Sequence, residues 1–276
     1  MLKLMYITNR ADIAQIAENN GVDRIFVDME WIGKIARQGG MDTVQSHHTL
    51  EDVKKIRKVI SKSELMVRVN PIHDATDSYC SSEEEINAVI DAGAEIIMLP
   101  FFKTVKEVEE FIKFVNRRAK TFLLLETPEA ADLLDEILEV PGIDEIHIGL
   151  NDMSLGYGMK FMFEPLVNGM LEKWCNKIST KGIPYGFGGI ASLGKGSLPA
   201  EYIIAEHYRL GSQYAILSRS FCNVDRVADL KDIKIIFENG LKEIRNYECE
   251  LLLKDKDFFE TNHNKIKKII DTIIKK

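Results

Sequence analysis

The chain has 276 residues, of which 45% are hydrophobic and 29% are charged, and its formal net charge is −7. This composition is that of an ordinary globular protein, with enough residues for one large domain or two small ones. The acidic balance argues against a nucleic-acid-binding protein, which usually carries a basic face. The lysines of the last stretch, NKIKKIIDTIIKK, fit the solvent face of a helix better than a nucleic-acid arm.

The four cysteines lie far apart and include no C-x-x-C pair, which predicts reduced thiols in a cytoplasmic protein. The first residues, MLKLMYITNRAD, lack the long apolar core of a signal peptide. No apolar run approaches the roughly 18 residues that a membrane span requires. We therefore expect a cytoplasmic protein with neither a membrane nor a nucleic acid as partner.

Eight short apolar runs alternate with segments of helical periodicity along almost the whole chain. In chain order the runs are KLMYIT, DRIFVDME, ELMVRVN, EIIMLPF, TFLLLET, EIHIGLND, IPYGFGG and YAILSRS. Each has about the length of a buried parallel strand, and none shows the alternation of a half-exposed strand. Eight such units predict a (β/α)₈ (TIM) barrel. The alternative is a doubly wound open sheet, which more often has a glycine-rich loop after its first strand, and ITNRAD is not one.

Residues that start helices or end turns stand between these runs. Thr49 and Ser82 precede acidic first turns and are the predicted N-caps of two helices. Turns from a helix into a strand favour a residue that tolerates positive φ, and glycines stand just before four of the runs, at Gly21, Gly93, Gly142 and Gly182.

The chain divides into a predicted barrel core, residues 1–222, and a C-terminal helical extension, residues 223–276. The first helical stretch of the extension, around Ile233, can close the barrel as its eighth helix. The second, around Ile266, exceeds what the barrel needs. Its apolar face is expected to pack on a neighbouring subunit, which predicts a homo-oligomer.

Charged side chains follow several of the predicted strands, at the barrel end where such folds place their chemistry. Glu126 and Asp152 end adjacent strands, so their carboxylates can converge, and they repel each other unless a proton or a cation lies between them. Hard oxygen ligands suit Mg²⁺ or Mn²⁺. Arg68 could bind a substrate oxygen opposite the metal. The alternative is that Glu126 and Asp152 merely cap helices.

The same residues lie in motifs of a known family. The stretch LLLETPEAADLLDEILEVPGIDEIHIGLNDMSLGYGM, together with VRVNP, GAEIIMLP and DRIFVDME, resembles the HpcH/HpaI aldolase and citrate lyase β-subunit family. The resemblance covers roughly residues 20–160 and continues more loosely to about residue 222. It implies a metal-dependent carbon–carbon lyase or aldolase that acts on a pyruvate-like 2-oxo acid in a (β/α)₈ barrel.

The resemblance also implies roles for individual residues. Glu126 and Asp152 occupy the two metal-ligand positions, so that Mg²⁺ or Mn²⁺ would chelate a 2-oxo acid and stabilise its enolate. Arg68 occupies the substrate-binding position. Backbone N–H groups around Asn151 and Asp152 would hold the substrate carboxylate, and Gly149 is also expected to bind substrate.

One departure from the family concerns the acid–base group. Family aldolases continue D-x-E-H after the second strand, whereas this chain reads DMEW, so that Trp31 replaces the histidine. Asp28 and Glu30 remain, and they are expected to position metal-bound water. His47 or His48, from the long loop that follows, is the candidate acid–base residue. The alternative is that they are surface histidines beside a helix N-cap.

Other departures involve strands four, seven and eight. LPFFKT replaces the usual L-P-K-x-E, which puts Phe101 in place of a lysine and Lys103 in place of a glutamate. Loops seven and eight could bind phosphate, which would indicate a phosphorylated or sugar-like substrate. The residues of this predicted pocket are Gly188, Gly189, Lys195, Ser218 and Arg219. The alternative is a flexible loop and a salt-bridged arginine. His73 is a third acid–base candidate, and His147 is expected to be a core residue.

Two other functions remain open. The metal–enolate scaffold could serve a phosphoenolpyruvate- or thioester-using enzyme that does not need the missing histidine. The barrel could instead be a catalytically silent ligand-binding protein, although such a protein has no need for a pair of repelling carboxylates.

Overall fold

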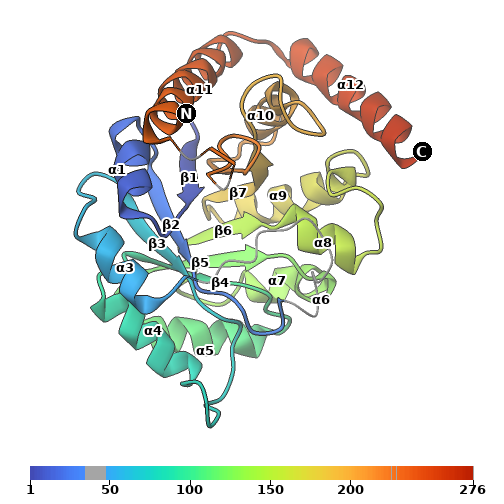
Figure 1. The fold of residues 1–276 in the computed structure, drawn as a ribbon. Coiled ribbons are helices and arrows are strands. Elements are labelled where there is room, and N and C mark those ends of the chain that lie inside the picture. The colour runs from blue at the N-terminus through green and yellow to red at the C-terminus, as the bar shows by residue number, and fades with distance from the viewer. Residues whose placement is uncertain (35–47, 225, 228, 276) are drawn as a thin grey trace.

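The computed structural model describes residues 1–34, 48–224, 226–227 and 229–275. Its parallel strands form a closed eight-stranded barrel in chain order, from β1 beside β2 round to β8 beside β1, which confirms the predicted fold (Figure 1). The strands are β1 (Lys3–Ile7), β2 (Arg24–Asp28), β3 (Glu64–Arg68), β4 (Ile96–Leu99), β5 (Lys120–Leu125), β6 (Glu145–Ile148), β7 (Tyr185–Ile190) and β8 (Tyr214–Leu217).

Helices connect the strands and cover the outside of the barrel. They are α1 (Ala11–Asn19), α3 (Leu50–Arg57), α4 (Ser82–Asp91), α5 (Val105–Val115), α6 (Pro128–Asp132), α7 (Leu134–Ile137), α8 (Leu150–Gly156), the 3₁₀ turn η1 (Glu164–Leu166), α9 (Met170–Thr180), α10 (Ala200–Arg209), α11 (Leu230–Leu251) and α12 (Lys256–Ile274). None of the helices in the described part of the chain combines the length and the apolar character that crossing a membrane requires.

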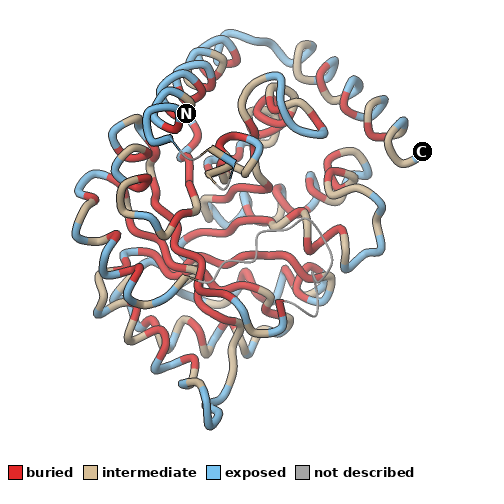
Figure 2. The backbone as a smooth tube through the Cα atoms, viewed as in Figure 1, coloured by how far each residue is buried: buried red, intermediate tan, exposed pale blue. Residues whose placement is uncertain are grey.

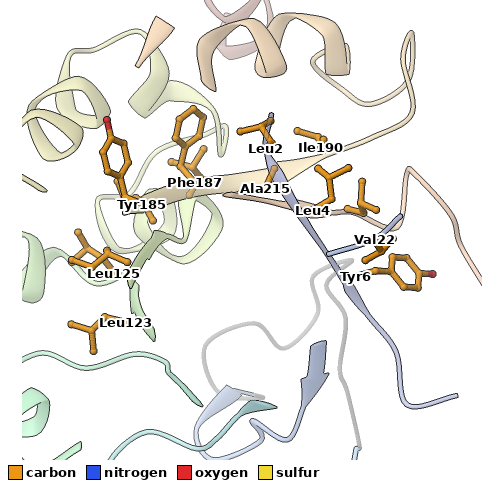
Figure 3. Close-up of a cluster of buried hydrophobic side chains, with 14 of the residues drawn as sticks. Leu2, Leu4, Tyr6, Val22, Leu123, Leu125, Tyr185, Phe187, Ile190 and Ala215 are labelled. Carbon is orange, nitrogen blue, oxygen red and sulfur yellow. The ribbon is translucent and has the colours of Figure 1, made fainter. Parts of the chain in front are cut away.

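Side chains alternate between the two faces of the strands, and this alternation creates two hydrophobic layers. The larger layer lies between the strands and the helices, and Figure 3 shows part of it, including Leu4, Leu123 and Phe187. The smaller layer fills the barrel interior and includes Phe26, Met66, Phe122 and Leu124. Buried residues accordingly follow the strands, while the outer helix faces are exposed (Figure 2).

The interior-facing positions carry charges at both ends of the barrel. Along β2 the inward set is Arg24, Phe26 and Asp28, which places an arginine at the amino end and a carboxylate at the carboxyl end. The same alternation places Arg68 and Glu126 at the carboxyl ends of their strands. The strand period therefore brings these charges to one mouth of the barrel.

At the opposite end, Arg24 forms a buried ion cluster. Its Nη1 and Nη2 atoms donate to the Glu145 carboxylate over 2.5 and 2.8 Å, and its Nε donates to Glu64 over 2.8 Å. Its guanidinium carbon also lies 4.7 Å from the centre of the Tyr214 ring. Burial lowers the pKa of Arg24, but the two carboxylates outweigh it and raise that pKa, so the guanidinium remains charged.

One of the two predicted N-caps is wrong by one residue. Thr49 caps α3 as predicted, in a capping box with Asp52. The cap of α4, however, is Ser81 and not Ser82, because the Ser81 side chain accepts from the Glu84 N–H. The Ser82 hydroxyl instead accepts from the backbone N–H of His73, which ties the loop after β3 to the start of α4.

The two C-terminal helices pack on the barrel's helical layer and follow one another along one side of the molecule (Figure 1). Helix α11 lies against α1 and α10. Helix α12 packs on α10 of its own chain, buries Ile266 and Ile270, and holds Tyr202 and Glu206 through Asn262. The surplus apolar face is thus at least partly covered within the chain, and a contact with a second subunit stays a prediction.

Candidate active site

A pocket of about 340 Å³ opens at the carboxyl ends of β4, β5 and β6. Its walls come from the segment after β4, from the end of β5 with the start of α6, and from α8. The lining residues are Phe101, Lys103, Glu126, Thr127, Pro128, Glu129, Asp152, Leu155 and Gly156. The predicted pair, Glu126 and Asp152, therefore shares one pocket.

Both of these carboxylates are buried. Glu126 is 4% exposed and directly follows β5, while Asp152 is 9% exposed and lies in the first turn of α8. Glu126 is not the cap of its helix, because the Thr127 hydroxyl has that position and accepts from the Ala130 N–H. The capping alternative is thus wrong for Glu126, which lines the pocket instead.

Two backbone features hold Glu126 in place. The N–H of Phe101 donates to Glu126 Oε1 over 3.1 Å, and Phe101 has a φ of +49°, a conformation that non-glycine residues rarely adopt. Gly149 lies against the other side, since a Cβ atom there would stand 2.8 Å from Glu126 Oε2. A side chain at position 149 would therefore displace the carboxylate.

The residues present fit a divalent metal ion. Within residues 1–34, 48–224, 226–227 and 229–275, no group of three or more His, Cys, Asp and Glu side chains is placed to hold a metal. Two carboxylates remain, with hard oxygen donors and with a pocket beside them. This is the donor set that suits Mg²⁺ or Mn²⁺, which complete their coordination with water and substrate oxygens.

Arg68, at the end of β3, makes a bidentate ion pair with Asp28 at the end of β2. Nε and Nη2 of Arg68 each donate to the carboxylate over 2.7 Å. Burial lowers the pKa of Arg68, but the charges of Asp28, Glu30 and Glu126 outweigh it and raise the pKa. Burial raises the pKa of Asp28, yet Arg68 and Lys34 outweigh it, so that pKa is well below its usual range. Both groups are therefore charged at neutral pH, and Arg68 lies within electrostatic reach of Glu126.

Lys34 belongs to the same cluster, although the sequence patterns did not single it out. Its side chain is 4% exposed, and its Nζ atom lies 2.9 Å from Asp28 Oδ2 and 3.4 Å from Glu30 Oε2. From the sequence, a lysine a few residues after a predicted strand is expected to be an ordinary exposed loop residue. The only available signal was its closeness in sequence to Asp28 and Glu30.

The candidate histidines are only partly described. His47 lies outside the described residues. His48 is next to the mouth, where its Nδ1 accepts from the Asp28 backbone N–H over 3.0 Å, but it lines a second pocket of about 450 Å³ together with Trp31. Burial lowers the pKa of His48, so its ring is neutral at pH 7. Because Nδ1 is an acceptor, the ring proton of this neutral form lies on Nε2.

Two further histidines that the sequence analysis considered, His73 and His147, have structural contacts. His73 contacts the carbonyl groups of Pro71 and Cys80 through its two ring nitrogens, which makes it part of the loop after β3. His147 is a core residue, as predicted: it is buried, its Nε2 donates to the Gly188 carbonyl over 3.0 Å, and burial lowers its pKa to about 4.

The remaining predicted substrate-binding residues lie around the same end of the barrel, but outside the first pocket's lining. Gly188 belongs to β7 with a φ of +54°, and Arg219 follows β8. Asn151 lies beside Asp152 in the first turn of α8. Gly149, which precedes α8, donates its N–H to the Leu125 carbonyl, so that N–H already has a partner. A phosphate site in loops seven and eight stays a prediction.

The fold and the pocket define a (β/α)₈-barrel protein with an acidic site at the carboxyl ends of its strands, the arrangement of barrel enzymes. A sequence model of the family described as "HpcH/HpaI aldolase/citrate lyase" matches residues 3–165. Because this match covers more than half of the chain, the protein belongs to that family. Family members are aldolases and lyases, and the chain is an enzyme of that class.

Individual relatives are distant. A 2-keto-3-deoxy-L-rhamnonate aldolase of Escherichia coli (strain K12) is 22% identical over 212 residues, covering 66% of this chain and 72% of the relative. An HpcH/HpaI aldolase from Desulfitobacterium hafniense DCB-2 superposes with a TM-score of 0.61 at 17% identity, covering 88% of this chain and 93% of that chain. The citrate synthase SbnG gives a TM-score of 0.60 at 16% identity, with 84% and 92% covered. The two structures support the fold.

Proposed function

We propose that the protein makes or breaks a carbon–carbon bond next to the carbonyl group of a 2-oxo acid, with the help of a divalent metal ion. The observation that carries this proposal is the pair of buried carboxylates, Glu126 and Asp152, in one pocket at the barrel mouth. The aldolase relative supports it, because its name specifies a 2-keto sugar acid. Arg68 adds the positive charge that an anionic substrate requires.

Glu126 and Asp152 would hold the metal ion. When bound, Mg²⁺ or Mn²⁺ supplies a Lewis acid that withdraws negative charge from the substrate's carbonyl oxygen. The chain's own contribution is to hold the Glu126 carboxylate at the pocket, through the Phe101 N–H and the absence of a side chain at Gly149. Helix α8 carries Asp152 into the same pocket.

Arg68 would bind and polarise the substrate. The ion pair with Asp28 uses Nε and Nη2, which fixes the plane of the guanidinium and leaves Nη1 outside that pair. A donor fixed in this way can stabilise charge that develops on an oxygen without reorganising during the reaction. We assign the substrate carboxylate to the backbone N–H groups around Asn151 and Asp152 in the first turn of α8.

A histidine of the 47–48 segment is our proposed acid–base group. For His48, the neutral ring has its proton on Nε2, so this atom can donate a hydrogen bond to a substrate oxygen. To act as a base, His48 would first have to break its hydrogen bond with the Asp28 N–H or change tautomer. Either change would alter the backbone at Asp28, which couples proton transfer to the cluster around Arg68.

The first test is turnover of 4-hydroxy-2-oxo acids, measured as the release of pyruvate. We expect pyruvate to form with Mg²⁺ or Mn²⁺ present, and the rate to fall by at least about 100-fold after treatment with EDTA, because the Lewis acid is lost. Adding back either cation should restore the rate. Turnover that is the same with and without EDTA would contradict the metal-dependent proposal.

The presence of Trp31 supports a second candidate function, because indole cannot replace a proton-transferring histidine at neutral pH. If no 2-oxo acid is cleaved but phosphoenolpyruvate or a thioester is consumed, the same scaffold serves that chemistry. Binding of these ligands without turnover would indicate a silent barrel. A phosphorylated or sugar-like substrate, a cytoplasmic location and homo-oligomeric assembly also stay proposals.

A further inference from the structure

We propose that Lys34 is a positioning residue that offsets the charge of Glu30, so that the cluster around Arg68 does not repel an anionic substrate. The inference rests on the proposed function, since it assigns the substrate's negative group to Arg68. Lys34 lies in the segment after β2, three residues beyond the Trp31 that replaces the family histidine.

The burial of Lys34 needs a specific reason. Lysine side chains are almost never fully buried unless they are paired with an opposite charge, because removing an ammonium group from water is costly. Lys34 is nevertheless 4% exposed, with its Nζ atom between Asp28 Oδ2, at 2.9 Å, and Glu30 Oε2, at 3.4 Å. A lysine with a merely structural role could have left its ammonium group in solvent and buried only its stem.

The charges of the cluster explain this position. Asp28 and Glu30 are each 1% exposed, and both contact the same guanidinium, through the pair with Asp28 and through a 3.4 Å contact from Arg68 Nε to Glu30. Two carboxylates facing Arg68 alone would give the cluster a net charge of −1. With Lys34 the four groups sum to zero.

Arg68 is the most exposed member of the cluster. Its side chain is 14% exposed, compared with 4% or less for the other three. A neutral cluster therefore presents a cation toward the mouth, with its balancing negative charges behind it. Without Lys34, the extra negative charge would repel the carboxylate of a 2-oxo acid at short range, where low dielectric strengthens the effect.

The experiment is calorimetric binding of oxalate in the presence of Mg²⁺, on the wild type, Lys34→Met and Lys34→Arg. We expect Lys34→Met to raise the dissociation constant of oxalate by roughly 10- to 100-fold, as one unbalanced charge a few ångström away would do. Lys34→Arg, which retains the charge, should bind within about threefold of the wild type. Equal binding by the wild type and Lys34→Met would overturn the inference.

A double variant separates charge balance from packing. Glu30→Gln combined with Lys34→Met removes one charge of each sign, so it should recover most of the affinity that Lys34→Met loses. If Lys34 acted only through packing, the double variant would bind no better than Lys34→Met, and the inference would be wrong. The comparison also holds if Lys34→Met alone fails to fold, because the double variant and Lys34→Arg are then judged against the wild type.

The outcomes also separate this inference from the proposed function. Wild type that fails to bind oxalate in a metal-dependent way would overturn the proposed function and the inference together. Wild type that binds oxalate with Mg²⁺, while Lys34→Met binds equally well, would overturn the role of Lys34 alone.

Discussion

Replacing Arg68 with methionine should lower kcat/KM for the 2-oxo acid by about 100- to 1,000-fold, which is the usual cost of removing one fixed donor from a developing oxyanion. The loss should appear in kcat as well as in KM, because the guanidinium is proposed to stabilise charge that develops during the reaction. Steady-state kinetics at saturating Mg²⁺ would measure both values.

Arg68→Met also leaves Asp28 and Glu30 facing Lys34 alone, so it needs a control for folding. Combining Arg68→Met with Asp28→Asn removes one charge of each sign and should restore stability without restoring activity. Arg68→Lys keeps the charge but cannot make the bidentate pair, and should recover only part of the rate. Activity of Arg68→Met close to that of the wild type would show that Arg68 has no part in the reaction.

A second large effect is expected at the other end of the barrel. Replacing Arg24 with methionine should lower the free energy of unfolding by about 3–5 kcal/mol, because it leaves the buried Glu145 carboxylate without its partner. Glu64 is less affected, since it also pairs with Lys120 on the surface. Urea unfolding of the wild type and the variant would give this difference.

The matched control for Arg24 removes both buried charges. Arg24→Met combined with Glu145→Leu replaces the ion pair by apolar groups, which is often neutral or stabilising. We therefore expect the double variant to be more stable than Arg24→Met. A loss below about 1 kcal/mol for Arg24→Met, or a double variant less stable than the single one, would show that the buried pair does not hold this end of the barrel together.

The barrel could be predicted from the sequence because its signal is periodic. Eight buried runs separated by helical segments leave few other topologies, and in a parallel barrel the ends of consecutive strands are neighbours. Because of that geometry, the sequence alone predicts that Glu126 and Asp152 lie close together. Their shared pocket confirms that they lie together, while their role as metal ligands stays a proposal.

The features that could not be predicted depend on individual contacts, which no periodic pattern in the sequence reveals. Lys34 lies in a connecting segment, where no spacing rule shows which charge its ammonium group meets. The cap of α4 required a choice between two adjacent serines that only the backbone conformation decides. For α12, an apolar stripe shows that a face is covered but not by what, and here α10 of the same chain covers part of it.

The measurement that tests the central claim most directly is calorimetric binding of oxalate, a mimic of the enolate, with and without Mg²⁺ or Mn²⁺. It would compare the wild type with Glu126→Gln, and with Glu139→Gln as a control that alters an exposed carboxylate paired with Lys181 away from the pocket. We predict metal-dependent binding by the wild type and the control, and its loss in Glu126→Gln. Binding that ignores the metal, or that Glu126→Gln retains in full, would contradict the account of Glu126 as a metal ligand.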